Sequence, residues 1–330
     1  MKTKVKKSTL LGFLSLLTLS GFFLYLLIGP VPTDIADLAS IFRKHSSAAA
    51  SIIADIRLPR ALLAFLVGAS LSLSGAILQG YFQNPMAGPF VVGVSSGASL
   101  GAVLSIILGL QLTVLGISMQ SIFAFISGFM IVTLVYLLSQ KKGVFKVETL
   151  LLTGIASGAL ASALTSFLIF FKSESYEQAV FWLLGSFHLA DWSHVAAVAP
   201  YFFVCLIASQ WLAKDMNLLV LGDETAYSLG CAVGRVRKIF LVMSTLLAAA
   251  SVSVSGVIGF VGLIIPHWMR ILTGPDHRSL FIFSSLAGGT FLLFSDLLAR
   301  TVLSPAELPI GIITAVVGAP FFIYLLNQTR

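Results

Sequence analysis

The sequence predicts an all-α polytopic membrane protein with about ten transmembrane helices. Of its 330 residues, 58% are hydrophobic and only 10% are charged, and the mean hydropathy is +1.01. Soluble domains carry roughly 25% charged residues. The apolar stretches are continuous and close to the roughly 20 residues that a membrane-spanning helix needs. Strands of a membrane β-barrel would alternate over about ten residues, so the sequence argues against a barrel.

Polar breaks divide the chain into ten apolar segments, which we treat as one transmembrane domain over residues 1–330. A basic stretch precedes the first segment and no small-x-small cleavage site follows it, so we expect an uncleaved first span. Short helices are expected around residues 34–42 and within 172–192. The ten spans are expected at 10–28, 59–80, 93–110, 117–138, 148–170, 193–212, 239–255, 258–271, 279–299 and 308–326.

The basic residues test this number of spans. Ten spans put both termini on one side, and that side then carries 14 of the 20 lysines and arginines. Cytoplasmic loops are enriched in these residues. We therefore expect a multi-pass protein of the bacterial cytoplasmic (inner) membrane with both termini in the cytoplasm. Basic inner loops also explain the net charge of +7, so no nucleic-acid partner is expected.

Small residues are dense in three of the expected spans, at 68–76, 93–102 and 153–166. Such residues let helices approach closely in lipid, so a tight bundle is the simplest interpretation. Gly154 and Gly158 have GxxxG spacing, which fits the same tight bundle, and small-residue packing in this fifth span suggests a dimer with a pathway at its axis. The third stretch also carries hydroxyl side chains that could line a pathway: Thr153, Ser157, Ser162, Thr165 and Ser166.

Charged residues are nearly absent from the spans. Asp296 and Arg300 are one helical turn apart near the outer end of the ninth span, where they can pair with each other or reach water. No chain of carboxylates or histidines crosses the bilayer, which argues against a proton-driven carrier. The two cysteines and five histidines have no metal-ligand spacing. We expect no catalytic residues, no metal and no cofactor, and hence a protein that is not itself an enzyme.

The longest polar interruption of the second half lies within about 213–238. It contains LGDETAYSLG, from Leu221 to Gly230, and glycines punctuate it. This pattern predicts one or two short helices in a compact lobe outside the bilayer. The chain has no GxxxxGK[ST] phosphate-binding loop, so we interpret the lobe as a docking surface for a separate protein that supplies energy. The alternative is a solvated loop that only connects two helices.

Four motifs in order carry a resemblance to a known family. They are RLPR at 57–60, SGAILQGYFQNPMAGP at 74–89, GVIGFVGLIIPHWMR at 256–270 and ELPIGIITAVVGAPFFIYLL at 307–326. Together they resemble the iron-siderophore, haem and cobalamin importer permeases of type II ATP-binding-cassette importers. The resemblance runs end to end. It implies the type II permease fold, inward transport of a metal chelate, a homodimer of permeases, two ATPase subunits inside and a substrate-binding protein outside.

The same resemblance implies roles for individual residues. The cytoplasmic coupling segment, which would rest in a cleft of the ATPase, corresponds to Gly222, Asp223, Glu224, Ala226, Gly230 and Gly234. An inner gate corresponds to Asn84, Pro85, Met86, Val147 and Glu148. Some members have small hydroxyl residues at the last two positions, so an acid there departs from the family pattern. The fifth and tenth spans resemble those that line the central pathway.

Three arginines near the outer ends of spans match residues that bind glutamates of the family's binding protein: Arg57, Arg60 and Arg300. The resemblance thus implies a docking surface, and Asp296 is expected to hold Arg300 in place when no partner is bound. The alternative is that these side chains extend toward lipid headgroups. Two other functions stay open at this stage, a secondary transporter of an organic solute and a membrane scaffold. The former predicts broken-helix sites with intramembrane charge.

Overall fold

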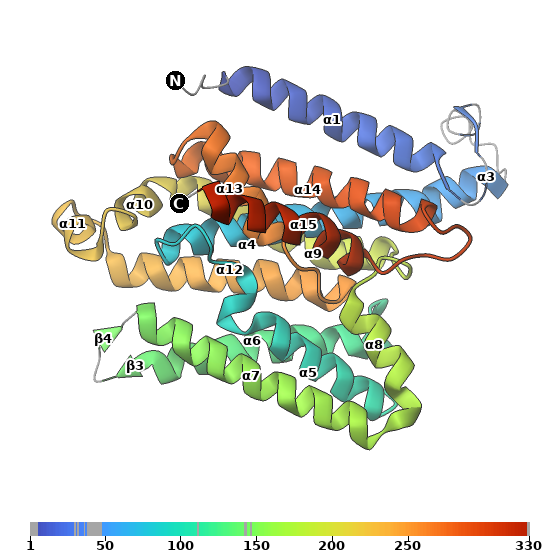
Figure 1. Cartoon of the computed structure of the whole chain (residues 1–330), viewed down its shortest axis with the longest axis horizontal. Coiled ribbons are helices and arrows are strands. Elements are labelled where there is room, and N and C mark those ends of the chain that lie inside the picture. Colours follow the sequence, from blue (N-terminus) through green and yellow to red (C-terminus); the bar gives the residue numbers. More distant parts are fainter. Residues whose placement is uncertain are drawn as a thin grey trace.

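The computed structural model describes residues 6–29, 31, 33–35, 37, 48–110, 112–141, 144–145 and 147–328. Within these ranges the chain forms a bundle of helices whose long axes run in roughly the same direction (Figure 1). The short helix expected around residues 34–42 lies almost wholly outside the described residues. So do seven of the basic residues counted above: Lys2, Lys4, Arg43, Lys44, Lys142, Lys146 and Arg330.

Ten apolar helices in the described ranges correspond to the ten expected spans. Seven are long enough to cross a membrane, and three, α5, α13 and α15, are shorter. Their bounds are α1 Lys7–Leu27, α4 Leu58–Tyr81, α5 Val94–Ile107, α6 Met119–Ser139, α7 Val147–Phe171, α9 Trp192–Trp211, α12 Val233–Ser255, α13 Val261–Thr273, α14 His277–Thr301 and α15 Ile310–Gln328.

Short elements connect these helices. The expected helix within 172–192 is present as α8, Tyr176–Leu184, which follows the 3-10 turn η3, Ser173–Ser175. Two antiparallel hairpins, β1 with β2 and β3 with β4, flank α6, with Thr113 opposite Ser118 and Gln140 opposite Phe145. The bounds of the remaining short elements are α3 Ala48–Ser51, η1 Ile52–Arg57, η2 Pro89–Val92, β1 Thr113–Val114, β2 Ile117–Ser118, β3 Gln140–Lys141, β4 Val144–Phe145, α10 Ala213–Leu219 and α11 Asp223–Ser228.

The second span begins earlier than the sequence predicts. Helical structure runs without a break from Ala48 to Tyr81, and the part over Ile52–Arg57 is a π-helix, a form that occurs mostly as short insertions within α-helices and is frequent at functional sites. Asp55 and Arg57 interrupt the apolar pattern there. Arg57 is nevertheless buried, because main-chain carbonyls of the preceding segment accept its hydrogen bonds.

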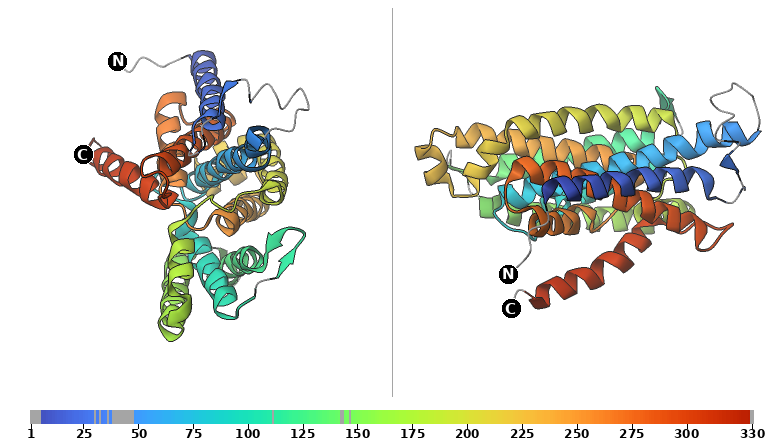
Figure 2. Two further views of the ribbon diagram at one scale, coloured as in Figure 1. Left: turned by 90° about the vertical axis from the view of Figure 1, so that its right-hand side faces the viewer. Right: turned by 90° about the horizontal axis from the view of Figure 1, so that it is seen from above.

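Helix α4 forms the centre of the bundle, where α14, α12, α13 and α9 pack around it (Figure 2). Its small residues explain how this crowding is possible. Gly75 lies so close to α13 that a Cβ on it would stand 1.7 Å from the carbonyl oxygen of Gly262. In lipid there is no hydrophobic driving force between helices, so van der Waals contacts at such close backbone approaches stabilise the bundle. The prediction of a tight small-residue bundle is therefore confirmed for 68–76.

The small residues of α7 pack against other segments of the same chain, as a tight bundle predicts. Gly154 contacts the backbone of η2, where a Cβ would meet the carbonyl oxygen of Val91 at 2.7 Å, and Gly158 faces Gly93 at the start of α5. The GxxxG pattern thus joins two segments of one chain, which confirms the tight-bundle interpretation for these two glycines. The opposite face of α7 is exposed and apolar, including Leu152, Leu160 and Phe167.

Candidate functional site

A short helical lobe projects from one end of the bundle and is the outermost part of the chain at that end (Figure 1). The lobe consists of α10 and α11, which link the end of α9 to the start of α12. Gly222 (φ +103°) precedes α11 and Gly230 (φ +86°) follows it. A Cβ at either position would meet open space, so the left-handed backbone, and not crowding, favours glycine there. The prediction of short helices in a lobe is confirmed.

Arg237 fixes α11 to the bundle. Its guanidinium donates to Oδ1 of Asp223 at 2.6 and 3.1 Å, and to the carbonyl oxygen of Tyr81 at 2.9 Å. Tyr81 is the last residue of α4, so the start of α11 and the end of the central helix share one buried cation. Hydrogen bonds with an ionised partner are about twice as strong as neutral ones. Arg237 therefore links the start of α11 directly to the end of α4.

Two further side chains tie α10 to the bundle. Gln83, just after α4, donates from Nε2 to the carbonyl oxygen of Leu219 at 2.8 Å. Asn217 donates to Oδ1 of Asp276 at 2.8 Å and accepts from the backbone N–H of His277, the first residue of α14, at 3.0 Å. The hydrogen bond from Asn217 holds the pKa of the Asp276 carboxyl below its usual value. The lobe is thus connected to both α4 and α14.

The outer surface of the lobe presents apolar side chains. Tyr227 is 77% exposed and Leu229 is 58% exposed, while Ala226 between the helix turns is fully buried. Glu224 is exposed beside them. Exposed apolar groups rimmed by polar ones mark protein contact surfaces, and tyrosine is common at their energetic centres. Sequence reasoning missed Tyr227 and Leu229, although large apolar side chains in and directly after such a polar six-residue helix were a usable signal.

Gly234 lies in the exposed first turn of α12, and nothing in the structure explains why this position is glycine. The other residues assigned to the coupling segment all lie in the lobe. Asp223 differs from the rest because Arg237 already binds its carboxylate, which leaves Glu224 as the acid that faces away from the bundle.

The residues assigned to an inner gate lie at the same end as the lobe. The chain turns back after α4, and Oδ1 of Asn84 accepts the backbone N–H of Met86 at 2.9 Å. Asn84 and Pro85 are exposed. Val147 and Glu148 begin α7, next to the β3–β4 hairpin, and Glu148 is exposed. In the described part of the chain, no hydrogen bond joins the 84–86 turn to the start of α7.

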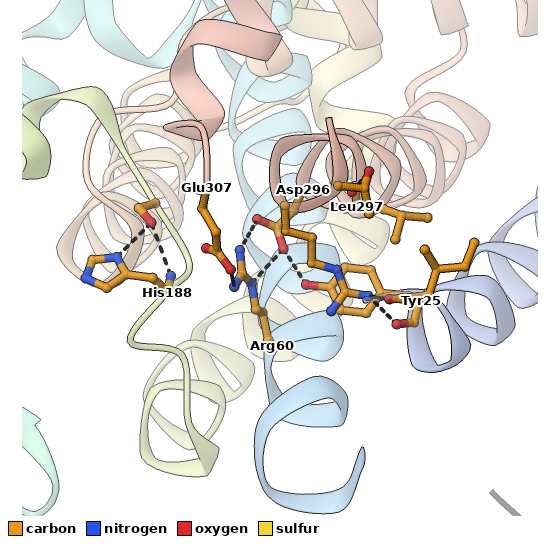
Figure 3. A network of polar contacts seen from close by, with 10 residues as sticks. Tyr25, Arg60, His188, Asp296, Leu297 and Glu307 are labelled. Carbon is orange, nitrogen blue, oxygen red and sulfur yellow. Dashed lines mark hydrogen bonds and ion pairs between the residues drawn. The ribbon is translucent and has the colours of Figure 1, made fainter. Parts of the chain in front are cut away.

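The opposite end of the bundle holds a buried charge cluster, formed by Arg57, Arg60, Asp296, Arg300 and Glu307. Figure 3 shows Arg60 between the two carboxylates. Its Nε and one terminal nitrogen donate to the two oxygens of Asp296, both at 2.9 Å, and its other terminal nitrogen donates to Glu307 at 2.9 Å. The three arginines are buried, whereas the Glu307 side chain is 33% exposed. The three arginines lie together at one end of the bundle, as predicted. Their side chains are buried, however, and do not extend freely from its surface.

Asp296 does not restrain Arg300, so that expectation is wrong. Asp296 accepts from Arg60 and from the hydroxyl of Tyr25. Arg300 instead donates to the carbonyl oxygens of Tyr25 and Ile28, and its guanidinium carbon lies 3.8 Å from the centre of the Tyr25 ring. The end of α1, which sequence reasoning did not consider, supplies these acceptors.

A cavity of about 280 Å³ adjoins this cluster between α8 and the segment before α15. His188 and Glu307 both line it. Partial burial, and then the nearby Arg60, lower the pKa of His188 and so favour the neutral form of its imidazole. The imidazole Nδ1 lies 2.8 Å from the hydroxyl of Ser186. Among the described residues, no group of three or more His, Cys, Asp or Glu side chains could hold a metal ion.

Comparisons with known proteins agree over nearly the whole chain. The model of the FecCD transport family matches residues 16–328. The chain is 45% identical over 277 residues, 84% of its length and 73% of the relative's, to the cobalamin import system permease protein of Halobacterium salinarum. It is 37% identical to the iron(3+)-hydroxamate import system permease protein of Bacillus subtilis, over the full length of both.

Two further matches are a haem transport permease and a solved transporter structure. The hemin transport system permease protein of Yersinia pestis is 40% identical and is covered over 83% of its length, with 84% of this chain. A solved metal-chelate type ABC transporter in an inward-facing conformation superposes with a TM-score of 0.87 at 35% identity. That match covers 98% of this chain and all of the solved one.

Proposed function

The chain belongs to the FecCD transport family and is a permease subunit of an ATP-binding-cassette importer, and we propose that it carries a metal chelate inward across the cytoplasmic membrane. The match to a metal-chelate type transporter along 98% of this chain is the observation that carries the proposal. An iron-siderophore is the cargo we favour, with haem or cobalamin as the other candidates. Relatives named for all three kinds of cargo align with most of the chain.

The energy for transport would come from two ATPase subunits that dock on the lobe. Support comes from the exposed Tyr227 and Leu229 and from the connections of α10 and α11 to α4 and α14. The positive-inside distribution of lysine and arginine favours a cytoplasmic position for the lobe. Helix α1 starts, and α15 ends, toward the end of the bundle at which the lobe projects (Figure 1), so we place both termini in the cytoplasm as well.

A second copy of the chain would complete the pathway. Helices α7 and α15 both leave apolar faces exposed, including Leu160 on α7 and Val316 on α15. Two such faces related by a two-fold axis would enclose a conduit lined mainly by apolar side chains. Such a lining offers few polar contacts, which suits a large cargo that must not bind tightly. We assign the inner gate of this conduit to the 84–86 turn and to Val147 and Glu148. Cysteines introduced at Asn84 should cross-link between two copies in at least one nucleotide state.

Uptake into proteoliposomes tests the transport function. The permease, its ATPase and its binding protein are reconstituted, and ferric siderophore, haemin and cobalamin are supplied outside as labelled cargo. We expect uptake of one of them that requires ATP on the lobe side and persists when ionophores remove ion gradients. Uptake that needs a gradient and continues without ATP would indicate a secondary transporter instead.

We also propose that the charge cluster helps to dock the substrate-binding protein. Three arginines against two carboxylates leave the cluster itself with one uncompensated positive charge, which would attract an acidic side chain of a partner. The burial of the arginines changes the choice of variant, because reversing Arg57 or Arg60 would disrupt the fold. Glu307→Gln is the better test, since it removes the exposed negative charge and leaves Arg60 bound to Asp296.

Surface plasmon resonance measures this effect. Glu307→Gln should raise the association rate of the binding protein several-fold at low salt, and the gain should shrink as salt increases. Glu177→Gln, an exposed acid on α8, is the matched control and should change the rate less. Equal rates for wild type and Glu307→Gln at low salt would remove the cluster from the docking surface.

A further inference from the structure

An apolar groove lies between α6 and α12 on the outside of the bundle, and neither transport nor docking accounts for it. Its volume is about 220 Å³. Each wall is one face of a helix, because the lining residues fall at positions i, i+3, i+4 and i+7 on both helices. The α6 wall runs from Phe129 to Tyr136, and the α12 wall runs from Lys238 to Thr245.

The groove opens onto the outer, apolar surface of the helix bundle. Its neighbours on α6 include Met130 and Leu134, and Val242 lies in the α12 wall, all of them exposed. Large exposed apolar side chains on a membrane span face lipid or another membrane helix. Seven residues of helix rise by about 10 Å, so the groove reaches about a third of the way into a hydrocarbon core of roughly 30 Å.

One end of the groove is basic. Lys238 is exposed and lines the groove at the end nearest the lobe. Arg235, also exposed, lies three residues earlier and therefore on the same face, one turn farther out. No carboxylate lines the groove. The opening therefore combines positive charge at headgroup depth with an apolar channel that leads away from it.

We propose that this groove binds an anionic phospholipid, with one acyl chain between α6 and α12 and the phosphate on Lys238 and Arg235. A lipid fits both halves of the site at once, whereas a soluble anion would leave the apolar walls uncovered. Basic pockets between membrane helices on the cytoplasmic side suit anionic headgroups, because anionic lipids are enriched there. Lys238 adjoins Arg237, which holds α11, so the bound lipid would lie beside the connection between lobe and bundle.

Native mass spectrometry of the delipidated full-length protein tests the site. We expect phosphatidylglycerol to bind in preference to phosphatidylcholine of the same chain length. The double variant Arg235→Gln, Lys238→Gln should weaken phosphatidylglycerol binding on the order of 20-fold, since each basic residue contributes a factor of about five. Lys214→Gln removes one exposed charge from α10 outside the groove and serves as the control.

A second pair of variants separates lipid from headgroup binding. Val242→Trp fills the groove and should abolish the preference for phosphatidylglycerol, whereas Leu134→Trp, on the adjacent exposed face of α6, should not. Glycerophosphoglycerol, which has the headgroup without acyl chains, should not compete. Three results would each overturn the proposal: equal binding of the two lipids to wild type, equal loss in Lys214→Gln and the double variant, or full binding in Val242→Trp.

Discussion

Asp296→Ala is expected to lower the free energy of unfolding by about 3–5 kcal/mol, the range for breaking a buried ion pair from one side. Both carboxylate oxygens of Asp296 accept from Arg60 at 2.9 Å, and the hydroxyl of Tyr25 donates to one of them. The Asp296 side chain is 1% exposed. Its removal leaves the buried guanidinium with only Glu307 as a carboxylate partner. The large cost arises from this uncompensated charge, more than from the attraction that is lost.

The free energy is measured by titrating micelles of the purified protein with a denaturing detergent and following far-UV circular dichroism. The double variant Arg60→Met, Asp296→Leu removes both charges and fills similar volume, so it should recover most of the lost stability. A change of less than about 1 kcal/mol for Asp296→Ala would refute the reasoning, since ordinary surface substitutions reach about half that size. A double variant as unstable as Asp296→Ala would refute it as well.

Three other variants test single contacts. Arg237→Gln should release α11 from the bundle. Amide hydrogen exchange over Asp223–Ser228 should then be faster than in the wild type, with unchanged exchange in α14. Wild-type exchange rates in α11 would show that Arg237 does not hold this helix. Gly75→Leu should prevent close packing of α4 on α13 and give an aggregated or strongly destabilised protein by size-exclusion chromatography, and a monodisperse, stable variant would contradict the packing. Asn217→Ala should raise the pKa of Asp276 toward its usual value, measured as a smaller loss of stability when the pH falls below about 4, because a depressed carboxyl pKa stabilises the fold only above the unfolded value.

The membrane helices could be predicted from sequence because each is a long, continuous run of apolar residues. Twenty apolar residues in a row need no partner to be recognised, and each expected span coincides with a helix to within a few residues at most ends. The start of the second helix could not be predicted in this way. Asp55 and Arg57 look like a boundary, and the acceptors that make Arg57 compatible with burial, at the end of α1 and in the segment after it up to Thr33, lie at least 24 residues away in sequence.

The candidate sites show the same limit. From a sequence alone, contacts can be predicted only between residues about one helical turn apart. Asp296 was therefore paired with Arg300, four residues away. Its actual partner, Arg60, is 236 residues away in sequence. The lobe was easier, since glycines and polar residues signal a turn outside the membrane. The bracing by Arg237 was not visible, because nothing local indicates that Asp223 and the end of α4 meet at that side chain.

The central claim, that the lobe couples the permease to its ATPase, is tested most directly by the affinity between the two proteins. The dissociation constant of the purified ATPase for the reconstituted permease is measured alongside ATP-driven uptake in the same proteoliposomes. Leu229→Asp and the double variant Glu224→Lys, Gly230→Leu should weaken binding at least tenfold and reduce uptake in proportion. Leu115→Asp, which changes a side chain that is 93% exposed outside the lobe, should leave both unchanged. Full affinity and full uptake in both lobe variants, with the protein folded, would contradict the account.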